Sequence, residues 1–186
     1  AAFDADNVDD YLNNIPFADH GALLDPPTAD VSARCISMLA QLGETPDSPR
    51  QRAAIEYLER EQLADGSWFG RWGVNYIYGT WSALCALNAA GRDAAAPSVA
   101  KAAAWLVSIQ NQDGGWGEDC ASYKLDYRGH EPAPSNASQT AWALLGLMAA
   151  GQVDHPAVTR GIAYLQQTQD ASGLWPQEAY TGGGFP

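Results

Sequence analysis

The sequence predicts an all-α protein that is part of an (α/α) toroid, a barrel in which paired helices build an inner and an outer ring. The first observation is a motif found three times, at residues 62–68, 110–116 and 169–175, in which a Gln precedes a Trp by six positions. The second is that each copy ends a helical pattern, and the third is that the helices alternate between two kinds. A repeat of this type indicates similar units stacked on one another.

Each copy of the motif also has a Gly before the Trp and an aromatic–Leu pair upstream of the Gln. The matching residues are Gln62, Gly66, Trp68, Gln110, Gly114, Trp116, Gln169, Gly173 and Trp175, with Tyr57–Leu58, Trp105–Leu106 and Tyr164–Leu165. A Gln amide can satisfy helix-end carbonyls, Gly permits a tight turn, and Trp buries a large face with one N–H to satisfy. The motif therefore predicts a structural clasp, and contact of these Trp side chains with substrate is the alternative.

The first helix pair follows a segment rich in turn formers, residues 1–27, which we expect to be an ordered loop with little regular structure. Thr28 is expected to cap a helix that runs to about residue 42 and ends at Gly43. A second helix is expected over about residues 49–62, because Ser48 can cap it and a Pro fits its first turn.

The second pair is predicted over residues 81–90, capped by Thr80 and ended by Gly91, and over residues 99–109, capped by Ser98. Its first helix is apolar on nearly all sides, which is typical of a buried helix, whereas the second is amphipathic. This alternation favours an inner and an outer ring. A linear solenoid of helix pairs is the competing architecture.

The third pair is predicted from Ser135 or Asn136 to Ala150, followed by a last helix that opens at Pro156. Compared with the second pair, the extra length lies in residues 117–134, which we expect to be connecting structure. The whole chain, 1–186, is predicted to be a single partial domain whose three repeats end near 68, 116 and 175. Because it opens and stops abruptly, we expect it to be a piece of a longer protein.

Composition excludes several function classes. The net charge of −12 argues against nucleic-acid binding and gives no electrostatic attraction to anionic lipid. Cys35, Cys85 and Cys120 are odd in number and widely spaced, so we expect free thiols in a reducing compartment. Glu118, Asp119 and Cys120 with His130 fit no zinc spacing, and no metal site is expected.

The motifs resemble the QW motifs of triterpene cyclases, and the segments between them are similar to squalene–hopene cyclases. The similar segments are residues 13–17, 65–80 (DGSWFGRWGVNYIYGT), 111–120 (NQDGGWGEDC), 138–144 (SQTAWAL) and 180–186. The resemblance implies an isomerase that protonates a terminal alkene of squalene and closes rings through carbocations to hopene or hopanol, with no cofactor. It also implies a peripheral, monotopic protein on the cytoplasmic face of a prokaryotic-type membrane, and a homodimer is compatible with it.

The proton donor that the resemblance implies, an Asp in an Asp-x-Asp-Asp motif, is expected outside this chain. Residues 4–7 (DADN) imitate that motif only superficially and are expected to form a turn. By resemblance, Asn14 takes the place of a His that hydrogen-bonds the acid, and Asp10 matches a carboxylate near the same network. An Asn can donate a hydrogen bond but carries no charge. The alternatives are an ordinary turn Asn and a solvated loop Asp.

The same resemblance assigns four aromatic residues to the substrate cavity: Trp72, Tyr76, Tyr78 and Phe185. Aromatic faces stabilise positive charge and supply no nucleophile to trap a cation. Trp72 and Tyr78 would lie near the site of protonation and first ring closure, and Phe185 would face later cations. Core packing is the alternative for each, and it has most weight for Tyr76.

Three other functions remain as alternatives. An oxidosqualene cyclase shares the repeats, but that branch has Cys at the position of Asn75. A zinc prenyltransferase subunit would need an Asp-x-Cys pair, whereas Asp119 and Cys120 are adjacent. A non-enzymatic helical-repeat binding module would have no use for the aromatic segment 72–78. If the chain is a fragment, we expect it to be inactive in isolation.

Overall fold

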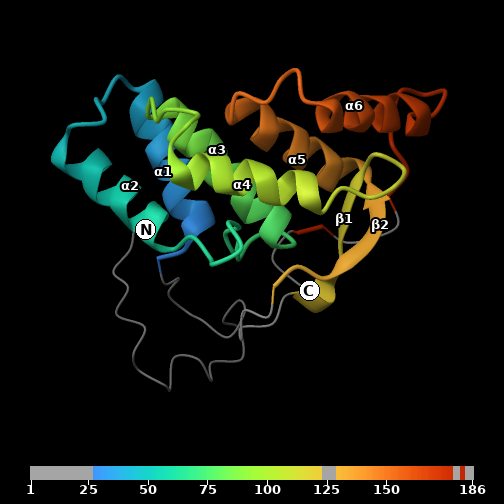
Figure 1. Ribbon diagram of the computed structural model, residues 1–186, viewed down its shortest axis with the longest axis horizontal. Coiled ribbons are helices and arrows are strands. Elements are labelled where there is room, and N and C mark those ends of the chain that lie inside the picture. Colours follow the sequence, from blue (N-terminus) through green and yellow to red (C-terminus); the bar gives the residue numbers. More distant parts are fainter. Residues whose placement is uncertain (1–26, 123–128, 178–180, 183–186) are drawn as a thin grey trace.

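Three helix pairs follow one another in the computed structural model, which describes residues 27–122, 129–177 and 181–182 (Figure 1). The first helices of the pairs are α1 (Ala29–Gln41), α3 (Tyr76–Ala89) and α5 (Ala137–Ala149). The second helices are α2 (Pro49–Arg60), α4 (Pro97–Ser108) and α6 (Pro156–Thr168). The prediction of an all-α fold built from helix pairs is confirmed.

The first helices form the inner layer. α3 packs between α1 and α5, and the second helix of each pair packs on the first. Most side chains of α3 are buried, including Leu84 and Leu87, as expected for a helix that is apolar on nearly all sides. At Gly146 of α5 the two inner helices approach closely, because an added Cβ would lie 3.3 Å from Cα of Trp81.

Most predicted helix ends are confirmed. Ser48 caps α2 by accepting a hydrogen bond from N of Gln51 at 3.2 Å, and Asn136 caps α5 by accepting from N of Gln139 at 2.8 Å. Thr28 occupies the cap position of α1, but its hydroxyl makes no capping hydrogen bond. α6 opens at Pro156 as predicted. The stop glycines adopt the expected positive φ, at +88° for Gly43, +73° for Gly91 and +74° for Gly151.

Two predicted caps are wrong. α3 begins at Tyr76 rather than after Thr80, whose Oγ1 instead accepts a hydrogen bond from N of Trp68 at 3.0 Å. α4 begins at Pro97, so Ser98 lies within the first turn and donates its hydroxyl to Oε1 of Glu59 at 3.2 Å. In both cases a tertiary contact uses the hydroxyl that the local sequence assigned to capping.

Residues 117–134 contain more regular structure than the predicted connection. β1 (Trp116–Glu118) pairs antiparallel with β2 (Pro132–Asn136), and a short 3₁₀ helix, η2 (Cys120–Ser122), follows β1. Two prolines in β2 argue against a strand in the sequence, but proline is tolerated where no ladder N–H is needed. The strands are therefore too short and too proline-rich to be recognised locally.

Two further findings concern the cysteines and the lengths of the helices. Cys35, Cys85 and Cys120 are free thiols, as predicted. Among the described residues, no helix combines the length and apolar character needed to cross a membrane.

Candidate functional site

The indole groups of the three repeated motifs all make the same hydrogen bond. Nε1 of Trp68 donates to O of Leu58 at 2.6 Å, and Nε1 of Trp116 donates to O of Leu106 at 2.8 Å. The third copy repeats the contact at 2.8 Å, from Trp175 to Leu165. These acceptors are the Leu residues that recur upstream of each Gln, and they lie near helix C-terminal ends where carbonyls lack intrahelical partners.

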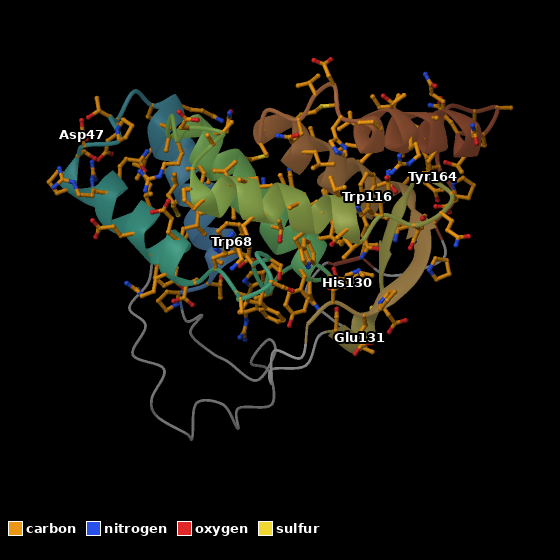
Figure 2. All side chains as sticks on the ribbon, in the orientation of Figure 1. Asp47, Trp68, Trp116, His130, Glu131 and Tyr164 are labelled. Atoms are coloured by element: carbon orange, nitrogen blue, oxygen red, sulfur yellow. The ribbon has the colours of Figure 1, made fainter. Side chains whose placement is uncertain are left out.

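The motif glutamines join one outer helix to the next. Nε2 of Gln62 donates to O of Gly66 at 2.9 Å and to O of Ser98, in the first turn of α4, at 2.8 Å. Gln110 makes the equivalent bonds to its own turn and to Ala157 in the first turn of α6 at 2.8 Å. Figure 2 shows Trp68 and Trp116 within the body of the protein, where both are fully buried. These contacts are those that a structural clasp requires.

We predict that Trp116→Phe lowers the free energy of unfolding by about 1–3 kcal/mol, because it leaves the buried carbonyl of Leu106 without a donor. Trp175→Phe is the matched control, because the carbonyl of Leu165 also accepts a hydrogen bond from N of Gln169 at 3.2 Å and so keeps a donor when the indole is lost. Urea denaturation of the full-length protein carrying either change measures the difference. Equal losses for the two variants would contradict the structural account of the buried indole.

Tyr78, one of the aromatic residues expected in the cavity, belongs to an aromatic cluster on the inner helices. The ring of Tyr78 lies edge-on to Trp81 and Trp142, with centroids 5.6 Å and 5.1 Å away. Trp81 and Trp142 stack at 5.7 Å with an interplanar angle of 9°. The guanidinium of Arg34, on α1, lies 4.4 Å from the ring centroid of Trp81. Three inner helices therefore bring aromatic faces and a cation together.

Trp72 and Tyr76 have different surroundings. Trp72 is half-buried, and its backbone N donates to Oδ2 of Asp30 at 3.0 Å. Tyr76 is fully buried, lies edge-on to Phe69 at 5.5 Å, and its hydroxyl accepts a hydrogen bond from N of Gly129 at 3.0 Å. Tyr76 thus packs in the core, the alternative to a cavity position.

Asp30 and Arg34 lie beside this cluster but are not among the residues that the sequence predicts there. Asp30 is fully buried, and its Oδ1 has no hydrogen-bond partner among the described residues. Burial raises the pKa of the Tyr78 phenol, the negative charge of Asp30 raises it further, and Arg34 opposes both. The available signal was an Asp and an Arg four residues apart in α1, a spacing that places both side chains on one helix face.

The structure does not describe the remaining predicted site residues. Asp10, Asn14 and Phe185 lie outside the described residues, as does the segment 4–7. In the described part of the chain, no group of three or more His, Cys, Asp or Glu side chains could hold a metal ion.

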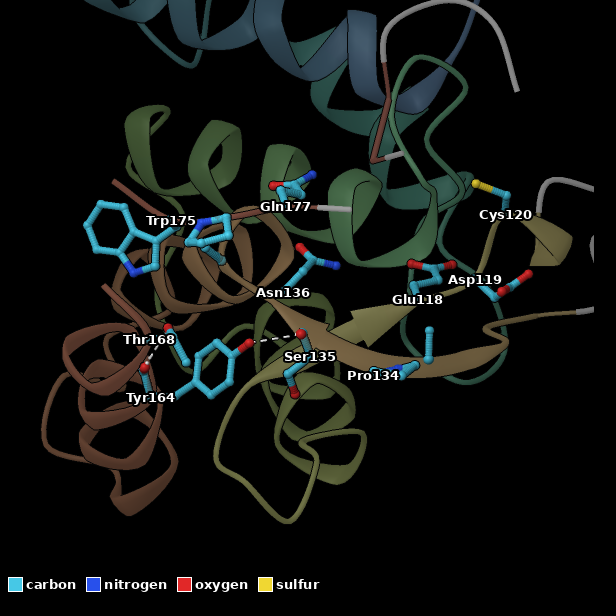
Figure 3. Close-up of a pocket in the computed structure, with 13 residues that line it drawn as sticks. Glu118, Asp119, Cys120, Pro134, Ser135, Asn136, Tyr164, Thr168, Trp175 and Gln177 are labelled. Atoms are coloured by element: carbon cyan, nitrogen blue, oxygen red, sulfur yellow. Dashed lines mark hydrogen bonds between the residues drawn. The ribbon is translucent and has the colours of Figure 1, made fainter. Parts of the chain in front are cut away.

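A separate groove of about 400 Å³ lies between the β1–β2 hairpin and the third motif (Figure 3). Its lining includes Ser135, Tyr164, Thr168 and Trp175. The hydroxyl of Tyr164 donates to O of Ser135 at 2.8 Å and fixes one wall. The groove is not lined by the aromatic cluster, so its shape does not bear on the chemistry expected there.

Comparison with known proteins gives consistent results. The family model described as "Squalene-hopene cyclase C-terminal domain" matches residues 1–186. The chain is 66% identical to a probable squalene–hopene cyclase of Sinorhizobium fredii, covering 100% of this chain and 29% of that protein. It is also 66% identical to the squalene–hopene cyclase of Zymomonas mobilis, covering 100% of this chain and 28% of that protein. The chain therefore spans less than a third of the length of these relatives.

Among solved structures, ent-copalyl diphosphate synthase from Streptomyces platensis is similar with a TM-score of 0.62 and 21% identity. The likeness covers 86% of this chain and 30% of that one. At this identity it concerns the fold alone. Together with the family match, it confirms the prediction of part of an (α/α) barrel rather than a linear solenoid.

Proposed function

Since the chain belongs to the squalene–hopene cyclase family, we propose that the longer protein of which it is part converts squalene to a pentacyclic triterpene, hopene or hopanol. The observation that carries the proposal is 66% identity over the whole of this chain to a squalene–hopene cyclase. The reaction begins when a carboxylic acid outside this chain protonates a terminal alkene. It continues by ring closure through carbocations, and no cofactor takes part.

This chain is proposed to supply surfaces that stabilise the cations. Tyr78, Trp81 and Trp142 present π-systems that attract positive charge, worth about 2 kcal/mol or more for a desolvated contact. Burial raises the pKa of the Tyr78 phenol, so that ring stays neutral and does not become a nucleophilic phenolate. The guanidinium of Arg34, 4.4 Å from the ring centroid of Trp81, supports this role because it places a positive charge over one face of the cluster.

Asp30 is proposed to hold the segment that carries Trp72. One carboxylate oxygen accepts the hydrogen bond from N of Trp72, and the other is buried without a partner among the described residues. Asp10 and Asn14 remain predicted as further support for the acid, and Phe185 as a ring facing later cations.

The proposal is tested by expressing the full-length protein, supplying squalene and analysing the products by gas chromatography with mass detection. Hopene or hopanol supports it. Cyclisation of oxidosqualene but not squalene would favour the oxidosqualene branch. Absence of any cyclised product from either polyene would leave a helical-repeat scaffold and contradict the proposed function.

We predict that the isolated 186-residue chain gives no turnover of squalene, because the proton donor is expected elsewhere in the protein. The measurement is the same product analysis with the purified chain in place of the full-length protein. Adding back the missing parts as a separate polypeptide is the control for loss of folding. Cyclised product from the chain alone would show that the donor is within these residues.

We also propose that the full-length protein binds the cytoplasmic face of a membrane as a peripheral protein, because a C30 hydrocarbon is dissolved in lipid rather than in water. Flotation of the full-length protein with vesicles tests this location. Sedimentation in detergent tests whether it is a homodimer.

A further inference from the structure

Glu118, at the end of β1, forms an unusual contact with α3. Its Oε1 accepts a hydrogen bond from N of Tyr76 at 3.0 Å, and its Oε2 accepts from N of Asn75 and N of Ile77, both at 3.0 Å. The residue is 4% exposed, so these bonds are shielded from water. One carboxylate from a distant part of the chain therefore satisfies three backbone amides at the start of a helix.

α3 depends on this external cap because it has none of its own. Asn75 stands at the cap position but makes no capping hydrogen bond, and its Nδ2 donates instead to Oγ of Ser122 at 2.9 Å. The first amides of a helix lack intrahelical partners and carry a partial positive charge. Among the described residues Glu118 forms no ion pair, so these amides are the groups that stabilise its buried charge.

Gln139 holds Glu118 in place from α5. Its Oε1 accepts from N of Glu118 at 2.7 Å, and its Nε2 donates to O of Glu118 at 3.2 Å and to O of Val74 at 3.1 Å. Gln139 is itself fully buried. The side chain of Gln139 therefore hydrogen-bonds both the backbone of Glu118 and that of Val74, which precedes α3. These bonds restrict the position from which the Glu118 carboxylate reaches the helix.

The helix start that Glu118 fixes carries the cation-facing aromatics. Tyr78 lies in the first turn of α3, and Trp72 lies in the segment that enters it. Glu118 contacts the backbone amides of residues 75–77 and not the ring of Tyr78, so its influence on that ring passes through the backbone of α3. Loss of the cap would let the first turn fray and would change the position of Tyr78 relative to Trp142.

We infer that Glu118 is a positioning residue for the cyclisation, because it fixes the first turn of α3 and so sets the place of Tyr78 in the aromatic cluster. This inference rests on the proposed function. Glu118 is not expected to contact substrate. Its removal should change which products form, since misplaced aromatic faces would stabilise the later cations less and allow early termination.

The test uses the full-length protein carrying Glu118→Gln, with squalene as substrate. An amide can accept at one oxygen only, and its NH₂ group would face a backbone N–H. We expect the ratio of incompletely cyclised to pentacyclic products to rise about tenfold, the change that loss of one hydrogen bond to a charged group produces. Product ratio is the readout because general loss of stability lowers the yield of all products together.

Ile55→Ala is the matched control, since it removes a buried side chain from α2, a helix that carries none of the cluster aromatics. It should lower the melting temperature and leave the product ratio unchanged. Gln139→Asn, which weakens the clamp but keeps the carboxylate, is measured if Glu118→Gln does not fold, and a smaller rise in the ratio is expected.

The outcomes are distinguishable. A wild-type product ratio from folded Glu118→Gln, or a ratio that changes no more than in Ile55→Ala, would overturn the positioning role. If the wild-type protein itself forms no cyclised product, the proposed function fails first, and the inference falls with it.

Discussion

Asp30→Asn is expected to lower kcat of the full-length protein about 10- to 100-fold while leaving its melting temperature unchanged or higher. Asn has the same shape, and its amide oxygen can keep the hydrogen bond from N of Trp72. The negative charge beside Arg34 and Tyr78 is lost, however. A hydrogen bond to a charged group is worth about 1.5–3 kcal/mol, and each 1.36 kcal/mol in a barrier is about tenfold in rate.

The melting temperature of Asp30→Asn distinguishes this role from a purely structural one. A buried carboxylate is expensive to desolvate, so its replacement by a neutral isostere is often neutral or stabilising. The matched control is Asp47→Asn, the same change at an exposed position in the turn before α2, where kcat should be unaffected. A kcat for Asp30→Asn within about twofold of wild type would show that the buried charge serves neither Trp72 nor the reaction.

Local sequence signals predicted the parts of the fold that depend on local physics. Unpaired backbone groups within one turn of a helix end determine its capping residue and its terminal glycine. The sequence correctly predicts the caps Ser48 and Asn136 and the terminal glycines. The Leu in each repeat was noted from its spacing alone. The structure gives the reason for that spacing, because the Leu carbonyl accepts the indole hydrogen bond from the Trp of its own repeat.

The errors arose where a distant group replaced a local one. The sequence predicts Thr80 as the cap of α3, whereas the first amides of this helix are capped by Glu118, more than forty positions away, and the side chain of Asn75 bonds to Ser122 instead. Asp30 was missed for a related reason. In the sequence it is an ordinary acidic residue in a first turn, and only the tertiary fold shows that it is buried against N of Trp72.

Gly79→Ala is expected to destabilise the protein by more than about 3 kcal/mol, although helix propensity alone favours Ala over Gly by about 1 kcal/mol. A Cβ at this position would lie 2.3 Å from O of Trp68, 2.7 Å from N of Gly70 and 2.8 Å from C of Phe69. All three are backbone atoms, which cannot move aside as a flexible side chain can. α3 would have to shift away from the first repeat.

Gly146→Ala provides the control because it is the same change inside another inner helix. There the nearest atom to an added Cβ is Cδ1 of Leu106 at 3.1 Å and the nearest backbone atom is Cα of Trp81 at 3.3 Å, so these neighbours need to move by only a few tenths of an ångström. Packing cost and propensity gain should nearly cancel, so the melting temperature should change little. If Gly79→Ala were equally mild, α3 would not be fixed against the turn of the first repeat. Glu118 would then have to hold the start of the helix without support from that turn.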